Sequence, residues 1–244
     1  MVSLRVCGMV KHYPASSNSS LSLSLAFANA KDYFDSLDFD FESHGRWLLT
    51  LILNSKRSLK KIQQLLANDT IDLWSIDEVR FQQYGSSCRM WIPAEDKDPV
   101  VLHHPTRRSI GYFGAIRLRD GKFFHCREQE KFNAETFFKF LILLRRISSR
   151  TRRQVMLIAD NARYHHASLH KEWRDSCSER FRIEFLPPYS PELNPIERVW
   201  KLTRRLAIHN RYFPSLDSII EAAEKVFSQW CHGNETLRKL CAII

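Results

Sequence analysis

The sequence is poor in glycine, in paired cysteines and in long apolar runs, each of which would indicate a particular class of protein. Only seven of its 244 residues are glycine, which argues against a fibrous or low-complexity protein. Its six cysteines form no C-x-x-C pair, so we expect no structural zinc site, and scattered cysteines suit a reducing cytosol. The apolar run 47–53 (WLLTLIL) is far shorter than the roughly 20 residues that span a bilayer. We therefore expect a cytoplasmic globular protein that does not enter a membrane.

Acidic residues are also scarce relative to basic ones. The chain has 37 Lys and Arg against 27 Asp and Glu, a net charge of +10. Residues 1–55 contain four basic and five acidic residues, which leaves 33 basic and 22 acidic residues, or +11, for the remainder. Positive charge of this kind steers a polyanion to the protein and releases its counterions, so nucleic acid is the expected partner. The alternative is a solvated basic face on an ordinary protein.

Hydrophobic periodicity and turn residues predict an α/β protein. Four predicted strands come before a stretch of alternating helices and strands. This order predicts a mixed sheet with helices on its faces. Asp120-Gly121 is a strong hairpin signal, and Asn133 is placed to cap a helix. We predict strands at 71–81, 88–93, both halves of 109–128, 155–160 and 183–188, and helices at 56–69, 134–150, 166–177, 195–210 and 215–230.

Three acids occupy comparable places in this pattern. Asp77 lies in the first predicted strand, Asp160 ends a buried strand, and Glu197 begins a helix after the last strand. Three carboxylates that met at one sheet edge would repel one another unless a divalent cation neutralised them. Two such ions can stabilise both the attacking and the leaving oxygen of a phosphoryl transfer.

Each of these acids also has a purely structural explanation. Asp160-Asn161 fits an Asx turn, and Asp77 could pair with Arg80. In the stretch Asn194-Pro195-Ile196-Glu197, the asparagine fits the N-cap position and the glutamate fits the third position of a capping box. A capping role and a metal role are compatible, because a helix start fixes the direction of the carboxylate.

Basic residues follow the same acids. Lys201, Arg204 and Arg205 lie four, seven and eight positions beyond Glu197, so on one continuous helix they share its face and could follow a phosphate backbone. A solvated basic face is the alternative. Two further residues close to Asp160, Arg163 and His165, are candidates for DNA contacts, and the histidine could instead orient the site. A second basic cluster comprises Arg145, Arg146, Arg150, Arg152 and Arg153.

The longest motifs resemble those of mariner-like bacterial insertion-sequence transposases of the DDE type. The resemblance rests on IDEVRF (76–81), IADNARYHHA (158–167) and FLPPYSPELNPIERVWK (185–201). It implies a ribonuclease-H-like fold in which Asp77, Asp160 and Glu197 are catalytic and bind two Mg²⁺ ions, with Mn²⁺ able to substitute. Glu78 competes with Asp77 for the first position, but strand alternation places it on the opposite face.

The same resemblance implies a DNA transposase. It would cleave phosphodiesters at insertion-sequence ends to free a 3′-hydroxyl, which then attacks target DNA and joins the strand to it, and it would act as a homodimer on paired ends. We expect residues 59–244 to form this catalytic domain with a C-terminal helix. Residues 1–58 form an irregular segment that lacks the helix-turn-helix pattern expected in front of it, so a truncated, non-autonomous remnant without catalysis is the main alternative. A ribonuclease-H-like nuclease acting on RNA–DNA hybrids is a third.

Overall fold

The computed structural model describes residues 56–89, 102, 104–149, 152–188, 190 and 193–242. The chain divides into two units, Met1–Thr50 and Leu51–Ile244, and all of these residues belong to the second. Within the described residues, no helix combines the length and the apolar character needed to cross a membrane.

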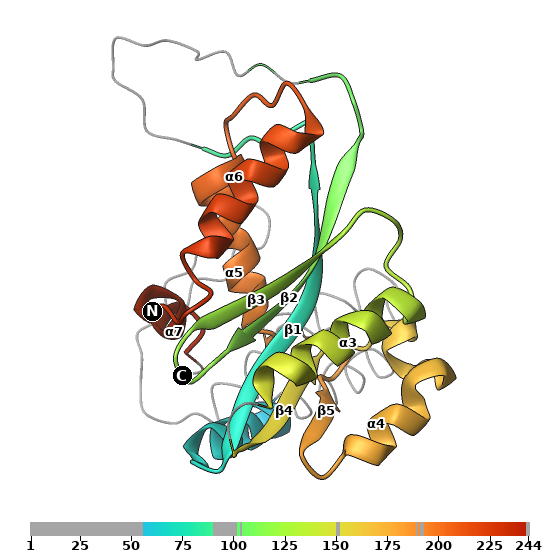
Figure 1. The fold of residues 1–244 in the computed structure, drawn as a ribbon. Helices are drawn as coiled ribbons and strands as arrows, with labels where there is room; N and C mark the ends of the chain where they lie inside the picture. Colours follow the sequence, from blue (N-terminus) through green and yellow to red (C-terminus); the bar gives the residue numbers. More distant parts are fainter. Residues whose placement is uncertain are drawn as a thin grey trace, which may run out of the picture. The chain divides into compact units, whose positions relative to one another are not determined.

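A five-stranded mixed sheet forms the centre of this unit (Figure 1). Its strands are β1 (Ile71–Gln82), β2 (Ser109–Arg117), β3 (Lys122–Glu128), β4 (Gln154–Ala159) and β5 (Phe181–Phe185), in the spatial order β3-β2-β1-β4-β5. The β1–β2 and β2–β3 pairs are antiparallel, whereas β1–β4 and β4–β5 are parallel. Each face of the sheet is apolar and is covered by helices.

Two hydrophobic cores lie on the two faces of the sheet. On one face α3 (Ala134–Ser148) and α4 (Lys171–Cys177) bury Trp74 and Phe113. On the other face α5 (Ile196–Thr203), α6 (Leu216–Ser228) and α7 (Glu235–Leu240) pack with Tyr112 and Phe123. Figure 1 shows α3 and α4 on the opposite side of the sheet from α5, α6 and α7. The predicted α/β class with a mixed sheet and flanking helices is confirmed.

Most predicted elements are present with small shifts of their ends. The hairpin turns at Asp120-Gly121, where the glycine adopts a φ of +68° that favours a residue without Cβ. Asn133 caps α3 by accepting a hydrogen bond from the Thr136 amide at 2.9 Å. The predicted helix 166–177 begins instead as two short 3₁₀ turns, η1 (Arg163–His166) and η2 (Ser168–His170).

Two predicted elements differ from the structure, and one helix was not predicted. Residues 88–89 are not in a strand, and the rest of the predicted strand 88–93 lies outside the described residues. The helix predicted at 195–210 changes after Thr203 into a π-helical turn, η4 (Arg204–Ile208), closed by an i to i+5 bond of 2.7 Å from the His209 amide to the Arg204 carbonyl. Helix α7 was not predicted, because its six residues are too few to show a hydrophobic period.

Candidate active site

The three predicted acids line a single cavity of about 560 Å³. Asp77 comes from the middle of β1, Asp160 follows the end of β4, and Glu197 lies in the first turn of α5. The parallel register pairs Ser75 with Ile158, so Asp77 and Asp160 stand at the same height on strands about 4.8 Å apart. Leu186, Pro187 and Pro188, which directly follow β5, form another wall.

Asp77 is held from the α5 side of the sheet. Its Oδ2 accepts a hydrogen bond of 3.0 Å from the indole Nε1 of Trp200, a side chain that is only 1% exposed. The large ring fits there because Gly114, the partner of Asp77 in the β1–β2 register, has no side chain on that face. A Cβ at Gly114 would lie 2.3 Å from Cη2 of Trp200. Arg80, the ion-pair partner considered above, lies instead over the Phe132 ring.

Burial raises the pKa of Asp77 well above its ordinary value. The charges of Glu78, Glu197 and Asp160 raise it further, in that order of importance. The carboxyl of Asp77 therefore resists ionisation while no positive charge is present in the cavity. A carboxylate group with this environment is a candidate functional residue, because a nearby cation would reverse the effect.

Glu78 points to the opposite face of β1, as strand alternation predicted. Its Oε1 accepts a hydrogen bond from the hydroxyl of Tyr164, and its Oε2 lies 3.9 Å from Nε2 of His165. Burial raises the pKa of Glu78, and the Tyr164 hydrogen bond opposes that shift. Glu78 does not line the cavity that holds the other three acids.

His165 links this network to Asp160. Its Nδ1 lies 2.9 Å from Oδ1 of Asp160, and this hydrogen bond is the main reason why the pKa of Asp160 is lowered. The Ala162 amide donates to the same Oδ1 at 3.2 Å, which forms the Asx turn considered above. Asp160 thus makes a structural turn and still lines the cavity, with its side chain 48% exposed.

The start of α5 is fixed by hydrogen bonds to β1 rather than by a capping box. The Asn194 side chain accepts from the Ser75 hydroxyl and donates to the Ile76 carbonyl at 3.2 Å. Ser75 Oγ in turn accepts from the Ile196 amide at 3.1 Å, so a β1 side chain satisfies the first turn of the helix. The predicted N-cap role of Asn194 and capping-box role of Glu197 are therefore wrong. The carboxylate of Glu197 is left for the cavity that Asp77 also lines.

The chemistry of these residues fits a divalent cation. All three are oxygen ligands of the kind that Mg²⁺ prefers, and the mutual repulsion that raises the pKa of Asp77 is what a cation would relieve. As they stand, no three His, Cys, Asp or Glu side chains among the described residues are close enough together to hold an ion. Binding would therefore require the carboxylate side chains to turn inward.

The residues predicted to contact DNA differ in how exposed they are in the structure. Arg163, Lys201 and Arg205 are exposed, whereas Arg204 is half-buried with its guanidinium 5.7 Å from the Phe81 ring centroid. The π turn changes the spacing along the helix, so Arg204 and Arg205 no longer follow the α-helical face of Glu197. His165 is only 1% exposed, which leaves it no surface to offer DNA and favours its role in holding Asp160.

The sequence pattern pointed to no site role for Trp200, Ser75, Tyr164 or Gly114. Trp200 does carry a signal, because a buried indole N–H needs a partner. Nothing local marks the other three, since their partners are far away in the chain.

The amino-acid sequence is similar to a protein family and to a curated protein. A sequence profile of the family described as DDE superfamily endonuclease matches residues 72–220, more than half of the chain. A 65-residue segment is 38% identical to the uncharacterized protein y4pE/y4sA of Sinorhizobium fredii. That match covers 27% of this chain and 44% of the relative, so the chain is matched to less than half of that relative's length.

Similar folds occur in solved structures of a mariner transposase. The Mos1 mariner paired end complex with Mn aligns with a TM-score of 0.56 at 13% identity, covering 95% of this chain and 77% of that one. The Mos1 strand transfer complex aligns with a TM-score of 0.53 at 15% identity, covering 95% and 76%. At these identities the likeness concerns the fold, and it confirms the ribonuclease-H-like architecture predicted above.

Proposed function

Because this chain belongs to the DDE superfamily of endonucleases, we propose that residues 59–244 form the catalytic domain of a DNA transposase. The domain cleaves phosphodiesters at the ends of an insertion sequence and transfers the freed strand to target DNA. The observation that carries this proposal is the cavity shared by Asp77, Asp160 and Glu197, which three separate elements bring together. Two of these acids lie in the long motifs that resemble the mariner-like family.

The three acids have a common role as ligands of divalent cations. Such ions, when bound, neutralise charge on the phosphodiester and activate the attacking oxygen, which is the chemistry that Mg²⁺ and Mn²⁺ supply in phosphoryl transfer. The structures of Mos1 with Mn and with Mg support the use of these two metals in a protein of this fold. Trp200 fixes one oxygen of Asp77, and His165 fixes one oxygen of Asp160.

DNA is the proposed partner, as transposon ends and as target. The net charge of +10 supports it, and the solved Mos1 structures of similar fold are paired-end and strand transfer complexes. Arg163, Lys201 and Arg205 present exposed cations for phosphate contacts. A homodimer on paired ends and a cytoplasmic location complete the proposal.

A nicking assay on supercoiled plasmid tests the proposal. The protein should convert the plasmid to nicked circles in Mg²⁺ and leave it intact in EDTA. Glu197→Gln should abolish nicking because an amide is a poor metal ligand, while its far-ultraviolet circular dichroism stays unchanged. Glu221→Gln, at an exposed position of α6, is the matched control and should remain active. Retained nicking by Glu197→Gln would exclude the role given to Glu197, and binding without nicking by the unaltered protein would favour a non-catalytic remnant.

A further inference from the structure

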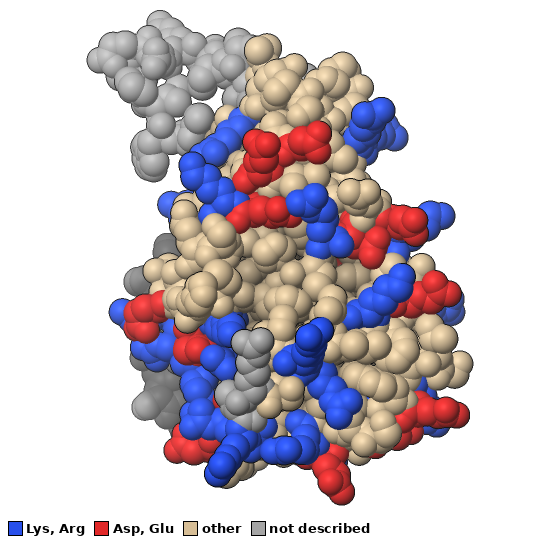
Figure 2. Space-filling model, viewed as in Figure 1, with Lys and Arg blue, Asp and Glu red and all other residues tan. Residues whose placement is uncertain are grey.

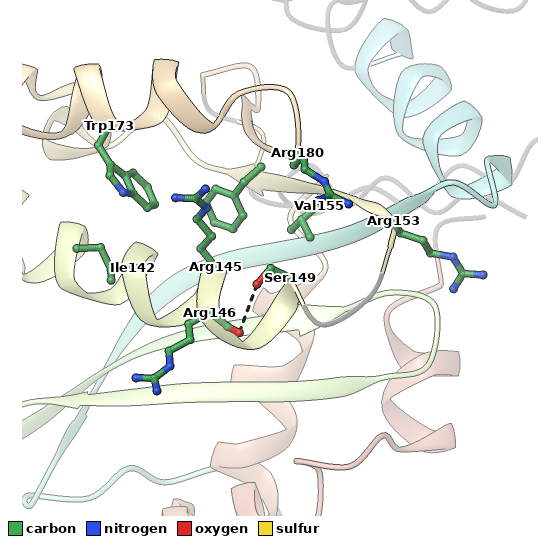
Figure 3. Close-up of a pocket in the computed structure, with 9 residues that line it drawn as sticks. Ile142, Arg145, Arg146, Ser149, Arg153, Val155, Trp173 and Arg180 are labelled. Atoms are coloured by element: carbon green, nitrogen blue, oxygen red, sulfur yellow. Dashed lines mark hydrogen bonds between the residues drawn. The ribbon is translucent and has the colours of Figure 1, made fainter.

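A second cavity, rich in arginine, lies at the other end of β4 from the candidate active site. Its volume is about 350 Å³, and Arg145, Arg146, Arg153 and Arg180 line it (Figure 3). Asp160 follows the last residue of β4, whereas Arg153 precedes the first. At about 3.3 Å per residue, the two cavities lie roughly 20 Å apart along the strand. The arginine cavity is therefore separate from the catalytic carboxylates.

The walls of this cavity are partly apolar and include buried side chains. Val155 of β4 and Phe181 of β5 are 2% and 3% exposed and contribute to its lining. The backbone of Arg180 is fixed at both ends, because its carbonyl accepts from the Val155 amide at 2.8 Å and its amide donates to the Cys177 carbonyl at 3.1 Å. Arg145 and Arg146 thus lie in the last turn of α3, and Arg153 and Arg180 directly precede β4 and β5.

Arg145 is placed to bind a ligand within the cavity, and Arg180 lies at its other side. In Figure 3 the guanidinium of Arg145 points into the space between α3 and α4, with Trp173 on one side and Arg180 on the other. It lies 5.5 Å from the Trp173 ring, a contact that holds the guanidinium while leaving its N–H edge available to an acceptor. Arg146 and Arg153 point outward from the cavity in the same view and form its rim.

The charge of the cavity is not balanced by nearby acids. Among the described residues, no carboxylate lies within ion-pair distance of Arg145, Arg146 or Arg180. Arg153 has one distant partner, the carboxylate of Asp72 at 3.7 Å, which two other arginines share. Figure 2 shows Lys and Arg gathered over the lower part of this face, where α3 ends and β4 begins. Such a concave group of like charges favours an anionic ligand.

We propose that this arginine cavity binds the phosphate backbone of a DNA segment outside the catalytic cavity. The planar guanidinium groups of Arg145 and Arg180 each match a phosphate oxygen pair, and the rim arginines extend the positive surface along a strand. The contacts are to phosphates and not to bases, so the cavity holds DNA without reading its sequence. This inference rests on DNA being the substrate, as proposed above, but not on cleavage.

The test measures binding of a labelled duplex of about 20 base pairs in EDTA by fluorescence anisotropy, between about 50 and 200 mM salt. The double variant Arg145→Ala/Arg180→Ala removes two exposed cations and should leave the fold intact. It should bind the duplex about tenfold or more weakly at low salt, and the slope of log K against log salt should fall by about two. Arg145→Lys/Arg180→Lys, which keeps the charge but loses the planar fork, should lie between the double alanine variant and the unaltered protein.

Lys225→Ala/Arg211→Ala is the matched control, because it removes two exposed positive charges elsewhere. An affinity and slope for the cavity variant equal to those of this control would overturn the proposal. The proposal would also be overturned if inorganic phosphate bound the cavity and stabilised the protein while the cavity variant and the control variant bound DNA alike. The cavity would then take free anions rather than DNA. Because EDTA prevents cleavage, the result is independent of nicking. If the unaltered protein failed to nick DNA but the cavity variant still bound the duplex more weakly than the control, the result would count only against the proposed function.

Discussion

Gly114→Ala tests whether the glycine in β2 exists to admit Trp200 beside Asp77. The new Cβ would lie 2.3 Å from Cη2 and 2.6 Å from Cζ2 of Trp200, and 3.2 Å from Cδ1 of Ile196. Overpacking of a core in this way costs about 1–3 kcal/mol. Replacing a glycine also restricts the unfolded chain, which restores about 0.4–1 kcal/mol. We therefore expect a net loss of about 1–2 kcal/mol in the free energy of unfolding.

For a unit of this size such a loss lowers Tm by about 2–8 °C, which thermal denaturation followed by circular dichroism can measure. The decisive control is the same change in a Trp200→Phe background, because phenylalanine lacks the two ring atoms that clash. There the Gly114→Ala change should cost much less, since only the 3.2 Å contact with Cδ1 of Ile196 opposes its favourable effect on the unfolded chain. Equal destabilisation in both backgrounds would refute the explanation of Gly114 as space for the indole.

Other predictions concern the groups that position the three acids. Folding raises the pKa of Asp77, so the stability that its neutral form provides is fully present below about pH 4 and is lost as the pH rises through the raised value. Asp77→Asn should therefore raise Tm at about pH 7 without metal and leave Tm unchanged at low pH. An equal or lower Tm at neutral pH would contradict this. His165→Leu removes the hydrogen bond to Asp160 and should weaken Mg²⁺ binding about 10- to 100-fold in a calorimetric titration. His165→Asn should recover part of this affinity. Equal loss of Mg²⁺ affinity in the two variants would indicate a merely structural histidine. Asn194→Ala removes the acceptor of the Ser75 hydroxyl and the amide that donates to the Ile76 carbonyl, and it should cost about 1–3 kcal/mol in thermal or urea unfolding. A stability within error of the unaltered protein would argue against the link from β1 to α5.

Local sequence signals predicted the elements whose causes are local. Asp120-Gly121 marks the hairpin because a tight turn needs a positive φ, and Asn133 marks a helix start because its side chain reaches an amide three residues away. The prolines after β5 mark the end of that strand in the same way. The motif that contains these prolines also includes Glu197, so the amino-acid sequence alone was enough to single out this acid.

The contacts that shape the candidate site depend on residues far apart in the chain. Asn194 looked like a helix cap in the sequence, yet its side chain accepts from Ser75, 119 positions earlier. For His165 the sequence left two roles open, a DNA contact or orientation of the site, and its burial between Asp160 and Glu78 favours the second. No periodicity or turn rule carries this information, because it arises only when β1, β4 and α5 have come together.

The central claim is that Asp77, Asp160 and Glu197 jointly hold divalent cations. A titration with Mn²⁺, followed by electron paramagnetic resonance of the free ion, tests it most directly and needs no DNA. We predict that the unaltered protein binds Mn²⁺, that Asp77→Asn, Asp160→Asn and Glu197→Gln each weaken binding severely, and that Glu221→Gln does not. Undiminished Mn²⁺ binding in any one of those three variants would contradict the shared site.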